Sequence, residues 1–338
     1  KGYANTGAYT CSDNVTIEEH THKWTPAGSS HACVCGATEN HQYDSTTGKC
    51  SICQSECPHS TVSNGSGGQE SVWTCSDCGK QMLVESTASD GTKTYGTDFK
   101  AAMKAAENGT TVKLLADIEW GITPQSRAEI TGDGKIVTLD LNGHKITSGW
   151  LDVGDKDTNE TYTACTLKII GKGSYEPPMY GGIITVDVKA TLDLSEWEGG
   201  TISTINISDS SNYEATTREA AVIVGPKAGT IGKLTFGNNQ LDKLKKTKLS
   251  GGSFNEIWVA DFGPVKLGEL LVSGYALQHD DGSYEQHTRT LQNESIYNVK
   301  VVKCLHPNME PDATTGIATC EYCGKSGKFA ASRRIFSI

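Results

Sequence analysis

The sequence has few features of nucleic-acid-binding or membrane-spanning proteins. Its 338 residues carry a formal net charge of −10, and its longest basic cluster is Lys243-Leu-Lys245-Lys246. Because phosphate neutralisation needs a clustered positive face, we expect no nucleic-acid partner. No apolar run approaches the roughly 18–20 residues that cross a bilayer, so we expect no membrane insertion.

Phe and Met are also scarce, with six and four copies, whereas Gly is abundant with 37. This composition favours strands and turns over helix bundles. The length suits two or more domains. Neither a signal peptide nor an initiator Met precedes Lys1, so we expect a monomeric segment of a longer chain.

The cysteines are unevenly distributed along the chain. Eight of the twelve lie between Cys11 and Cys78, three lie between Cys304 and Cys323, and Cys165 stands alone between these groups. We therefore expect the two ends to be stabilised by different interactions from those that stabilise the middle.

The clearest motif is C-x-H followed, after 13 to 15 residues, by C-x-x-C. A Cys-x-x-Cys turn places two thiolates on one side of a tight bend, and Cys-x-His supplies two more ligands, which completes a tetrahedron around zinc. Gly79 and Gly324 follow the second turns, where a positive φ is expected. The predicted ligands are Cys57, His59, Cys75 and Cys78 in one copy, and Cys304, His306, Cys320 and Cys323 in the other.

Two looser variants precede the first clear copy. Their predicted ligands are His20, His22, Cys33 and Cys35 in the first, and His41, Cys50 and Cys53 in the second. In the second variant Glu39 stands where the clear copies have their first Cys, and Glu39, Cys11 and His31 are all open as completing ligands. Trp24 and Tyr43 each lie two residues after a key His, where a ring could cover one face of a small bead.

Disulfides are the alternative interpretation of an even cysteine count in an extracellular chain. Every half-motif also carries a His in register, however, and a disulfide does not involve a histidine. No HExxH signature or deaminase signature accompanies the motifs, so we expect structural rather than catalytic zinc, with three to four Zn2+ ions per chain. Segments of about 20 residues cannot bury enough apolar surface to fold alone, so the metal would supply folding free energy.

The middle of the chain begins with a predicted helix at 97–108. Thr97 suits its N-cap, Asp98 suits its first turn, and Asn108-Gly109 suits its end. Its apolar residues recur at i, i+4 and i+7 and form one stripe. We expect this helix to plug one end of the core that follows.

Short predicted strands then alternate with Gly, Asn and Asp turns. Three Gly-Gly pairs, at 181–182, 199–200 and 251–252, each read as a tight corner followed at once by a strand. Even spacing without intervening helices predicts a mainly β fold, a right-handed parallel β-helix (solenoid), with a β-sandwich or jelly roll as the alternative. The expected strands cover 111–118, 135–141, 166–170, 182–188, 202–207, 221–224, 233–236, 253–259 and 267–272.

These patterns divide the chain into four expected parts. Tandem zinc beads cover 1–90, the β-helix covers 91–302, a further bead covers 303–326 and a tail covers 327–338. Insertions near 155–163, 174–180 and 275–292 would have to be loops.

Two segments carry a resemblance to a known family. TLDLNGHKIT at 138–147 resembles the first full rung of pectate-lyase-like β-helices in large surface proteins of Gram-positive bacteria, and LLVSGYAL at 270–277, followed by Asp281-Gly282, resembles their closing segment. Such proteins commonly alternate β-helices with C-x-H…C-x-x-C beads. The resemblance implies a modular, adhesin-like region on the cell surface and names no ligand.

Three function classes remain in view. A polysaccharide lyase or glycoside hydrolase needs paired carboxylates, for which Asp155 and Asp157 are the closest pair. A solvated loop explains this pair more simply, and we expect Asp140 and Asp193 to point outward and Asp280-Asp281-Gly282 to form a turn. A stiff spacer is the third class.

We favour a secreted or cell-surface binding region, without enzymatic activity, that recognises a glycan or glycoprotein of the host or matrix. Exposed rings beside loops could stack on sugars. The candidate rings are Trp120, Trp150, Tyr180, Trp197, Tyr213 and Trp258.

Overall fold

The computed structural model describes most of the chain, and its compact part divides into two units. The described residues are 21–27, 30–65, 72–119, 127–154, 164–177, 183–187, 189–207, 220–237, 246–260, 264–306 and 309–328. Unit 1 comprises Lys1–Asn64 and Thr74–Gln81, and unit 2 comprises Gly65–Trp73 and Met82–Ile338.

Unit 1 is built from short strands and turns. A three-stranded antiparallel sheet has the order β1-β2-β3, and β4 pairs with β5. The strands are β1 (Trp24–Ala27), β2 (Ser30–Cys33), β3 (Thr38–Asn40), β4 (Val62–Asn64) and β5 (Trp73–Cys75), the last of which crosses from unit 2 into unit 1.

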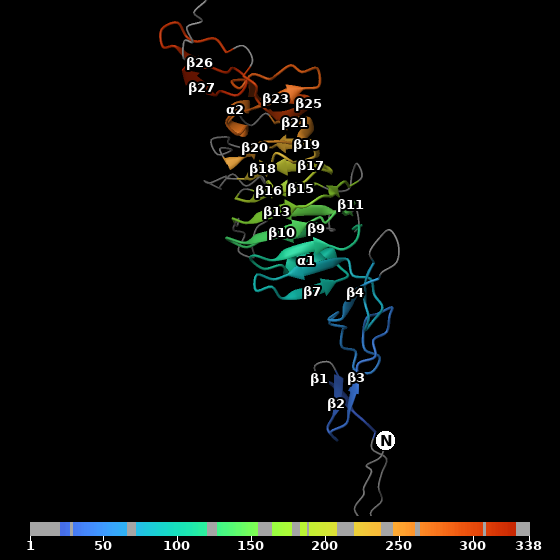
Figure 1. Cartoon of the computed structure of the whole chain (residues 1–338). Helices are drawn as coiled ribbons and strands as arrows, with labels where there is room; N and C mark the ends of the chain where they lie inside the picture. The colour runs from blue at the N-terminus through green and yellow to red at the C-terminus, as the bar shows by residue number, and fades with distance from the viewer. Residues whose placement is uncertain are drawn as a thin grey trace, which may run out of the picture. The chain divides into compact units, whose positions relative to one another are not determined.

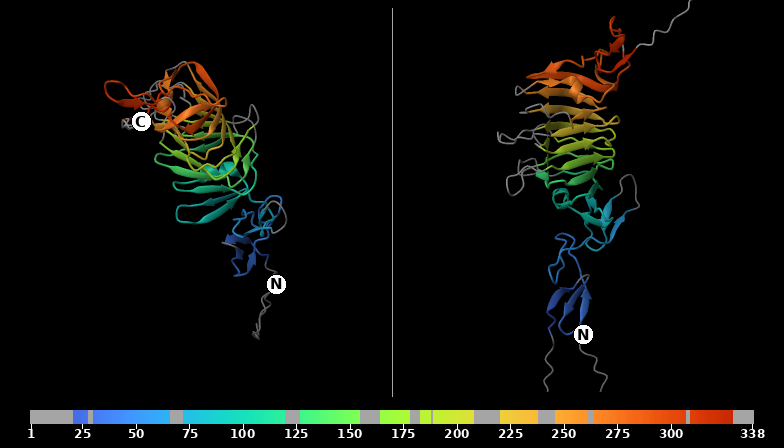
Figure 2. Two further views of the ribbon diagram at one scale, coloured as in Figure 1. Left: turned by 45° about the horizontal axis from the view of Figure 1, so that its top comes forward. Right: turned by 90° about the vertical axis from the view of Figure 1, so that its left-hand side faces the viewer.

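Unit 2 contains a β-solenoid of about four turns, which confirms the predicted solenoid (Figure 1; Figure 2, right). One wall is an eight-stranded sheet in the order β20-β18-β16-β13-β10-β8-β6-β7. Its strands are β6 (Val84–Thr87), β7 (Lys93–Gly96), β8 (Thr111–Leu114), β10 (Ile136–Asp140), β13 (Thr166–Ile170), β16 (Thr191–Leu194), β18 (Ala221–Val224) and β20 (Lys248–Leu249).

A second wall is a ten-stranded sheet in which eight strands follow the order β23-β25-β21-β19-β17-β15-β12-β9 and two short strands pair beside them. The eight are β9 (Arg127–Ile130), β12 (Trp150–Val153), β15 (Ile184–Val186), β17 (Thr201–Ile207), β19 (Thr230–Phe236), β21 (Ser253–Val259), β23 (Tyr275–His279) and β25 (Glu294–Lys303). The short strands are β11 (Lys145–Ile146) and β14 (Ser174–Tyr175).

Aliphatic side chains stack in columns between the two walls. In the ten-stranded sheet, one column of register partners runs through neighbouring strands and is fully buried. Each such side chain contributes roughly 1.5–3 kcal/mol by leaving water, so the alternating pattern of each strand fixes which face turns inward. The column consists of Leu151, Ile184, Ile205, Leu234 and Ile257.

Glycines allow successive rungs to approach closely at one corner. A Cβ on Gly200 would lie 2.0 Å from the carbonyl oxygen of Gly173, and a Cβ on Gly229 would lie 2.1 Å from that of Gly200. The predicted Gly-Gly corners are confirmed at 199–200 and 251–252, which directly precede β17 and β21. The third pair, at 181–182, lies outside the described residues.

Each end of each wall is closed by a different element. At the amino-terminal end, β6 runs antiparallel to β8 and β7 runs antiparallel to β6, and α1 (Phe99–Ala105) packs against β9. At the other end, β25 runs antiparallel to β21 and β23 runs antiparallel to β25, and α2 (Leu267–Leu270) packs against β20. Phe99 and Met103 of α1 are buried in the core, which confirms the predicted plug.

Several local predictions were wrong, and one of them is the loop expected near 174–180, which begins with β14. The helix predicted at 97–108 is shorter, and Asp98 rather than Thr97 is its N-cap, because the Asp98 carboxylate accepts a hydrogen bond from the Ala101 N–H at 3.1 Å. The strand predicted at 267–272 begins instead with α2, because Leu267 and Leu270 are spaced to bury the same face of a helical turn.

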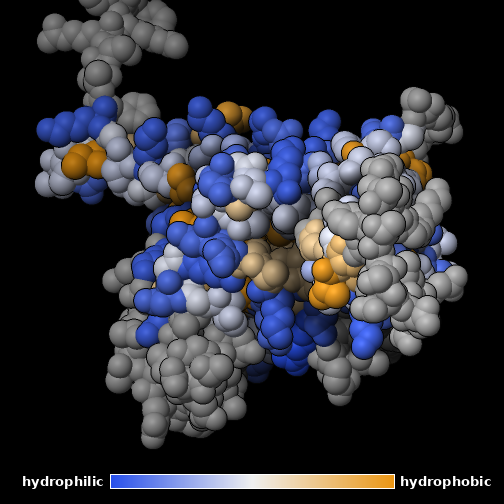
Figure 3. All heavy atoms as spheres, turned by 90° about the horizontal axis from the view of Figure 1, so that it is seen from below, coloured by the Kyte–Doolittle hydropathy of each residue, from blue (hydrophilic) through white to orange (hydrophobic). Residues whose placement is uncertain are grey.

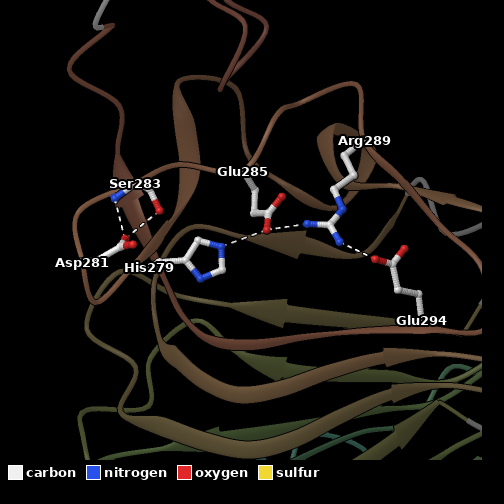
Figure 4. A network of polar contacts seen from close by, with 6 residues as sticks. All are labelled: His279, Asp281, Ser283, Glu285, Arg289 and Glu294. Atoms are coloured by element: carbon white, nitrogen blue, oxygen red, sulfur yellow. Dashed lines mark hydrogen bonds and ion pairs between the residues drawn. The ribbon is translucent and has the colours of Figure 1, made fainter.

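The segment 275–292, expected as a loop, contains β23 and β24 (Thr290–Leu291), and β24 pairs with β22 (Val265–Lys266) outside the segment. A polar network ties it together (Figure 4). The half-buried Glu285 carboxylate accepts hydrogen bonds from Arg289 and from the His279 ring at 2.8 Å, and Arg289 also pairs with Glu294. Asp281 receives the N–H and hydroxyl of Ser283, which confirms the predicted turn at 280–282.

Seven large hydrophobic side chains are exposed among the described residues. On the face seen from below in Figure 3, hydrophobic residues form groups between hydrophilic ones. Among the described residues, neither helix has the length and apolar character needed to cross a membrane.

Candidate metal centres

Four clusters of Cys and His side chains bring ligand atoms together. Within each cluster these atoms all lie within 4.8 Å of one another. The clusters are centre 1 (His22, Cys33, Cys35), centre 2 (His31, His41, Cys50, Cys53), centre 3 (Cys57, His59, Cys75, Cys78) and centre 4 (Cys304, His306, Cys320, Cys323).

The Cys-x-x-Cys turns of centres 3 and 4 have the same backbone hydrogen bonds. Cys75 N–H donates to the Lys80 carbonyl at 2.9 Å, and Gly79 N–H donates to the Cys75 carbonyl at 2.8 Å. Cys320 makes the corresponding pair of bonds with Lys325 and Gly324. Both glycines have positive φ, as predicted, so the turn directs both thiols to one side.

The Cys-x-His half of each motif adopts an unusual backbone. His59 and His306 have φ of 49° and 52°, a left-handed conformation that is costly for a residue with a Cβ. This conformation places His59 Nδ1 3.4 Å from Cys78 Sγ, and His306 Nδ1 3.2 Å from Cys323 Sγ. The strained backbone is therefore what brings each imidazole to its cluster.

The sulfur spacing distinguishes a metal site from a disulfide. Cys57 Sγ lies 3.7 Å from Cys75 Sγ, and Cys304 Sγ lies 3.5 Å from Cys320 Sγ. A disulfide requires about 2.05 Å, whereas two thiolates on one tetrahedral zinc are separated by about 3.8 Å. All eleven described cysteines are unbridged.

The fourth potential ligand of centre 2 is His31 on β2, and not Glu39 on β3. Glu39 is exposed and lies outside the cluster, whereas His31 is fully buried with Nε2 2.9 Å from Cys50 Sγ. His31 and Glu39 are register partners on β2 and β3. The ligand thus comes from the strand beside Glu39.

Centre 1 has a tighter turn than the others. Cys33 N–H donates to the Ala37 carbonyl and Gly36 N–H donates to the Cys33 carbonyl, so each hydrogen-bonded loop is one residue shorter than at centre 3. His22 Nδ1 lies 3.3 Å from Cys35 Sγ. The structure describes three ligands here, and His20 and Cys11 lie outside the described residues.

Aromatic rings cover centres 1 and 2, as predicted. Trp24 stacks on His22 with ring centroids 4.7 Å apart, and Tyr43 lies 5.4 Å from His41. The described part of 21–56 buries three side chains, those of His31, Cys33 and Cys50, and all three belong to a centre. A segment whose buried side chains are all ligands has no apolar core, so its residues fit a metal that holds the fold together.

The local electrostatics suit a bound cation. Burial raises the pKa of the Cys57 and Cys304 thiols to about 12, so a cation is needed to hold them as thiolates. Burial also lowers the pKa of His59, which favours the neutral imidazole that a metal requires. At centre 2, burial alone would raise the pKa of Cys50, but hydrogen bonds from Cys53 N–H and from the two His rings lower it to about 5.

Sequence reasoning missed a second repeat. Asp44 accepts hydrogen bonds from the backbone of Thr46 and from the backbone and hydroxyl of Thr47, and Asp312 makes the same three bonds with Thr314 and Thr315. The signal was present as Asp-x-Thr-Thr-Gly at 44–48 and 312–316. This turn lies between the imidazole and the thiolate pair of centres 2 and 4.

Centre 4 packs against the end of the solenoid within unit 2. His287 N–H donates to the Glu321 carbonyl at 2.7 Å, and a Cβ on Gly324 would lie 2.6 Å from the His287 ring. Ala276 of β23 is buried against the cysteines, with Tyr284 and Tyr322 around them. The hairpin of β26 (Ile317–Thr319) and β27 (Ser326–Lys328) completes this bead.

The described carboxylates that we considered for catalysis belong to turns. Asp140 accepts the Asn142 N–H and Asp193 accepts the Ser195 N–H, both at 2.9 Å, and both side chains point away from the core as expected. Asp155 and Asp157 lie outside the described residues.

The candidate aromatic rings differ in how far they are buried. Trp197 is fully buried, so it packs in the core rather than facing a ligand. Trp150 and Trp258 are half-buried, and each has a cation over its ring, Arg127 and Lys233 respectively, 5.2 Å from the centroid. Trp120, Tyr180 and Tyr213 lie outside the described residues.

Comparison with known proteins adds no relative. No protein-family model, curated protein or solved structure matches the chain.

Proposed function

We propose that the four centres bind zinc in a structural role and that they pin the small beads of a non-catalytic binding module. The spacing of about 3.5–3.7 Å between cysteine sulfurs at centres 3 and 4 carries the assignment. Zinc accepts tetrahedral sulfur and nitrogen ligands, and the four protein ligands of centres 2, 3 and 4 leave no open position for a substrate. Iron and copper are other metals that such ligands accept.

The metal content of the purified chain distinguishes zinc from another metal at the four centres. The chain, purified without added metal, is expected to contain about one zinc per centre by inductively coupled plasma mass spectrometry. A chelator should expose the cysteines to alkylation, and a mild reductant without chelator should not. Iron in place of zinc, or exposure caused by the reductant alone, would contradict the zinc assignment.

We further propose that the solenoid recognises a glycan or glycoprotein of a host or matrix, as part of an extracellular bacterial surface protein. Tyr297 supports this proposal because it is 58% exposed on the outward face of β25. Glu256 is its register partner, and Lys233 is the register partner of Glu256 one strand further along. An exposed ring beside charged side chains is the kind of surface on which a sugar stacks.

A glycan array tests this second proposal. The wild-type chain and Tyr297→Phe should bind the same glycans, because the ring is kept, whereas Tyr297→Ala should lose binding. Reducing-sugar release measured on the same glycans tests the alternative of a polysaccharide-cleaving enzyme. Turnover that Asp155→Asn or Asp157→Asn abolishes would replace the binding proposal, and an array without any binding would favour a spacer.

A further inference from the structure

Strand β2 supplies ligands to two different centres. His31 belongs to centre 2 and Cys33 to centre 1. Residues two apart on a strand point to the same face and lie about 6.6 Å apart. Both side chains are buried. The two centres are therefore joined by one short, stiff piece of backbone.

The rings of these centres also form a continuous series. The centroid of Trp24 lies 4.7 Å from that of His22 in centre 1 and 5.6 Å from that of His31 in centre 2. His31 then lies 4.6 Å from His41, which contacts Tyr43. Trp24 thus bridges a ligand of one centre and a ligand of the next.

We propose that centres 1 and 2 take up zinc as a coupled pair, so that an ion at either one raises the affinity of the other. This inference rests on the zinc assignment proposed above. An ion at centre 2 holds His31, and so fixes β2 and Cys33 before centre 1 is filled. The conformational entropy lost in ordering β2 is then shared by two ions instead of being lost separately for each.

Centre 4 provides an internal reference. Its four ligands lie in unit 2, and it shares neither a ligand strand nor a ring contact with centres 1 and 2 among the described residues. It packs on the solenoid through Ala276 and His287, which have a folded core beneath them. It should therefore fill independently of centres 1 and 2.

Alkylation at buffered zinc concentrations measures each centre separately. The metal-free full chain is equilibrated at a series of free zinc concentrations and treated briefly with N-ethylmaleimide, and each cysteine is quantified by peptide mass spectrometry. In the wild type, the cysteines of centres 1 and 2 should become protected over the same zinc range, with a steeper rise than one site gives. Separate, single-site curves would overturn the coupling.

Variants test the link directly. Cys35→Ser removes a ligand of centre 1 only, and it should move the protection of Cys50 and Cys53 to about 5- to 150-fold higher free zinc. Cys35→His, which restores a ligand, should move it back, whereas general damage to the bead would not be reversed. Cys323→Ser at centre 4 is the matched control and should leave both curves unchanged.

Reciprocity gives a second, independent readout. His41→Ala removes a ligand of centre 2, and it should shift the protection of Cys33 and Cys35 by the same factor, because a coupling free energy acts equally in both directions. If Cys35→Ser leaves the curve of Cys50 unchanged, the coupling is wrong and the zinc assignment stands. If no cysteine is protected at any zinc concentration, the proposed zinc binding itself has failed.

Discussion

The imidazole Nε2 of His31 lies 2.9 Å from the Sγ of Cys50, although 19 positions separate the two residues in the chain. His31 is fully buried in a segment without an apolar core. A buried imidazole is costly unless its nitrogen has a partner, and here the partner is a thiol in a cluster of four ligands. This relationship defines centre 2.

Replacing His31 tests that definition. His31→Ala should reduce the zinc content by about one ion per chain, because three remaining ligands hold zinc less tightly. Glu39→Ala, its cross-strand neighbour, should keep the full content, and His31→Cys should restore it. Metal analysis of the three variants decides the question. Loss of an ion in Glu39→Ala instead would show that the carboxylate is the fourth ligand.

Removing zinc should unfold unit 1 without unfolding the solenoid. The beads of unit 1 depend on ligands for their buried side chains, whereas the solenoid has a continuous aliphatic core. Hydrogen exchange with a chelator present should show rapid exchange at the Cys50 and Gly79 amides and unchanged protection at Leu192. Protection of the Gly79 amide that survives complete zinc removal would contradict this expectation.

A methyl group at the glycine corner should destabilise the solenoid. Gly229→Ala would place a Cβ 2.1 Å from the Gly200 carbonyl oxygen, and the rungs would have to separate. Overpacking of this kind costs about 1–3 kcal/mol. Gly327→Ala, whose Cβ would meet nothing within 4 Å, is the control and should be near neutral. Thermal unfolding followed by circular dichroism measures both variants.

The Glu285 network predicts a pH dependence. Burial alone would raise the pKa of Glu285, but hydrogen bonds from Arg289 and His279 outweigh it and hold this pKa below its usual value. A lowered folded-state pKa stabilises the fold above the unfolded pKa of about 4.3, and this stabilisation is lost as the pH falls through the folded value.

Glu285→Gln should therefore unfold more easily than the wild type at pH 7, by about 1–3 kcal/mol. The difference should shrink below about pH 4. Glu294→Gln is the comparison, because Glu294 is more exposed and contacts Arg289 alone among the members of the network in Figure 4. Urea unfolding at several pH values measures the effect. An equal difference at pH 7 and pH 3 would contradict it.

The solenoid was predictable because its signal is local. Alternation of apolar and polar residues around Leu167 and Leu192 fixes which face is buried, and the corner glycines mark where each rung turns. The strands at 166–170, 221–224 and 253–259 match the expected ranges. The strand prediction for 267–272 was wrong because the apolar residues of this segment are so frequent that they fit both a strand and a helical turn.

The candidate metal centres were predicted completely where all ligands lie in one motif, and in part elsewhere. Cys57 with His59, and Cys75 with Cys78, are close in sequence, so spacing alone identifies them. The sequence left Glu39, Cys11 and His31 open as the completing ligand, and the structure places His31 in centre 2 from the strand beside Glu39. Cross-strand neighbours lie about 5 Å apart in space, but their sequence separation depends on a turn that spacing does not reveal.

The closed ends of the solenoid have a consequence for assembly. A stack of parallel strands with bare ends is a template on which another copy can pair and extend a fibre. Here β6 and β25 run against the ladder and occupy the edges of β8 and β21, while α1 and α2 lie over β9 and β20. A second molecule therefore cannot pair directly with the last parallel strand of either wall. The number of parallel rungs is set within the chain itself.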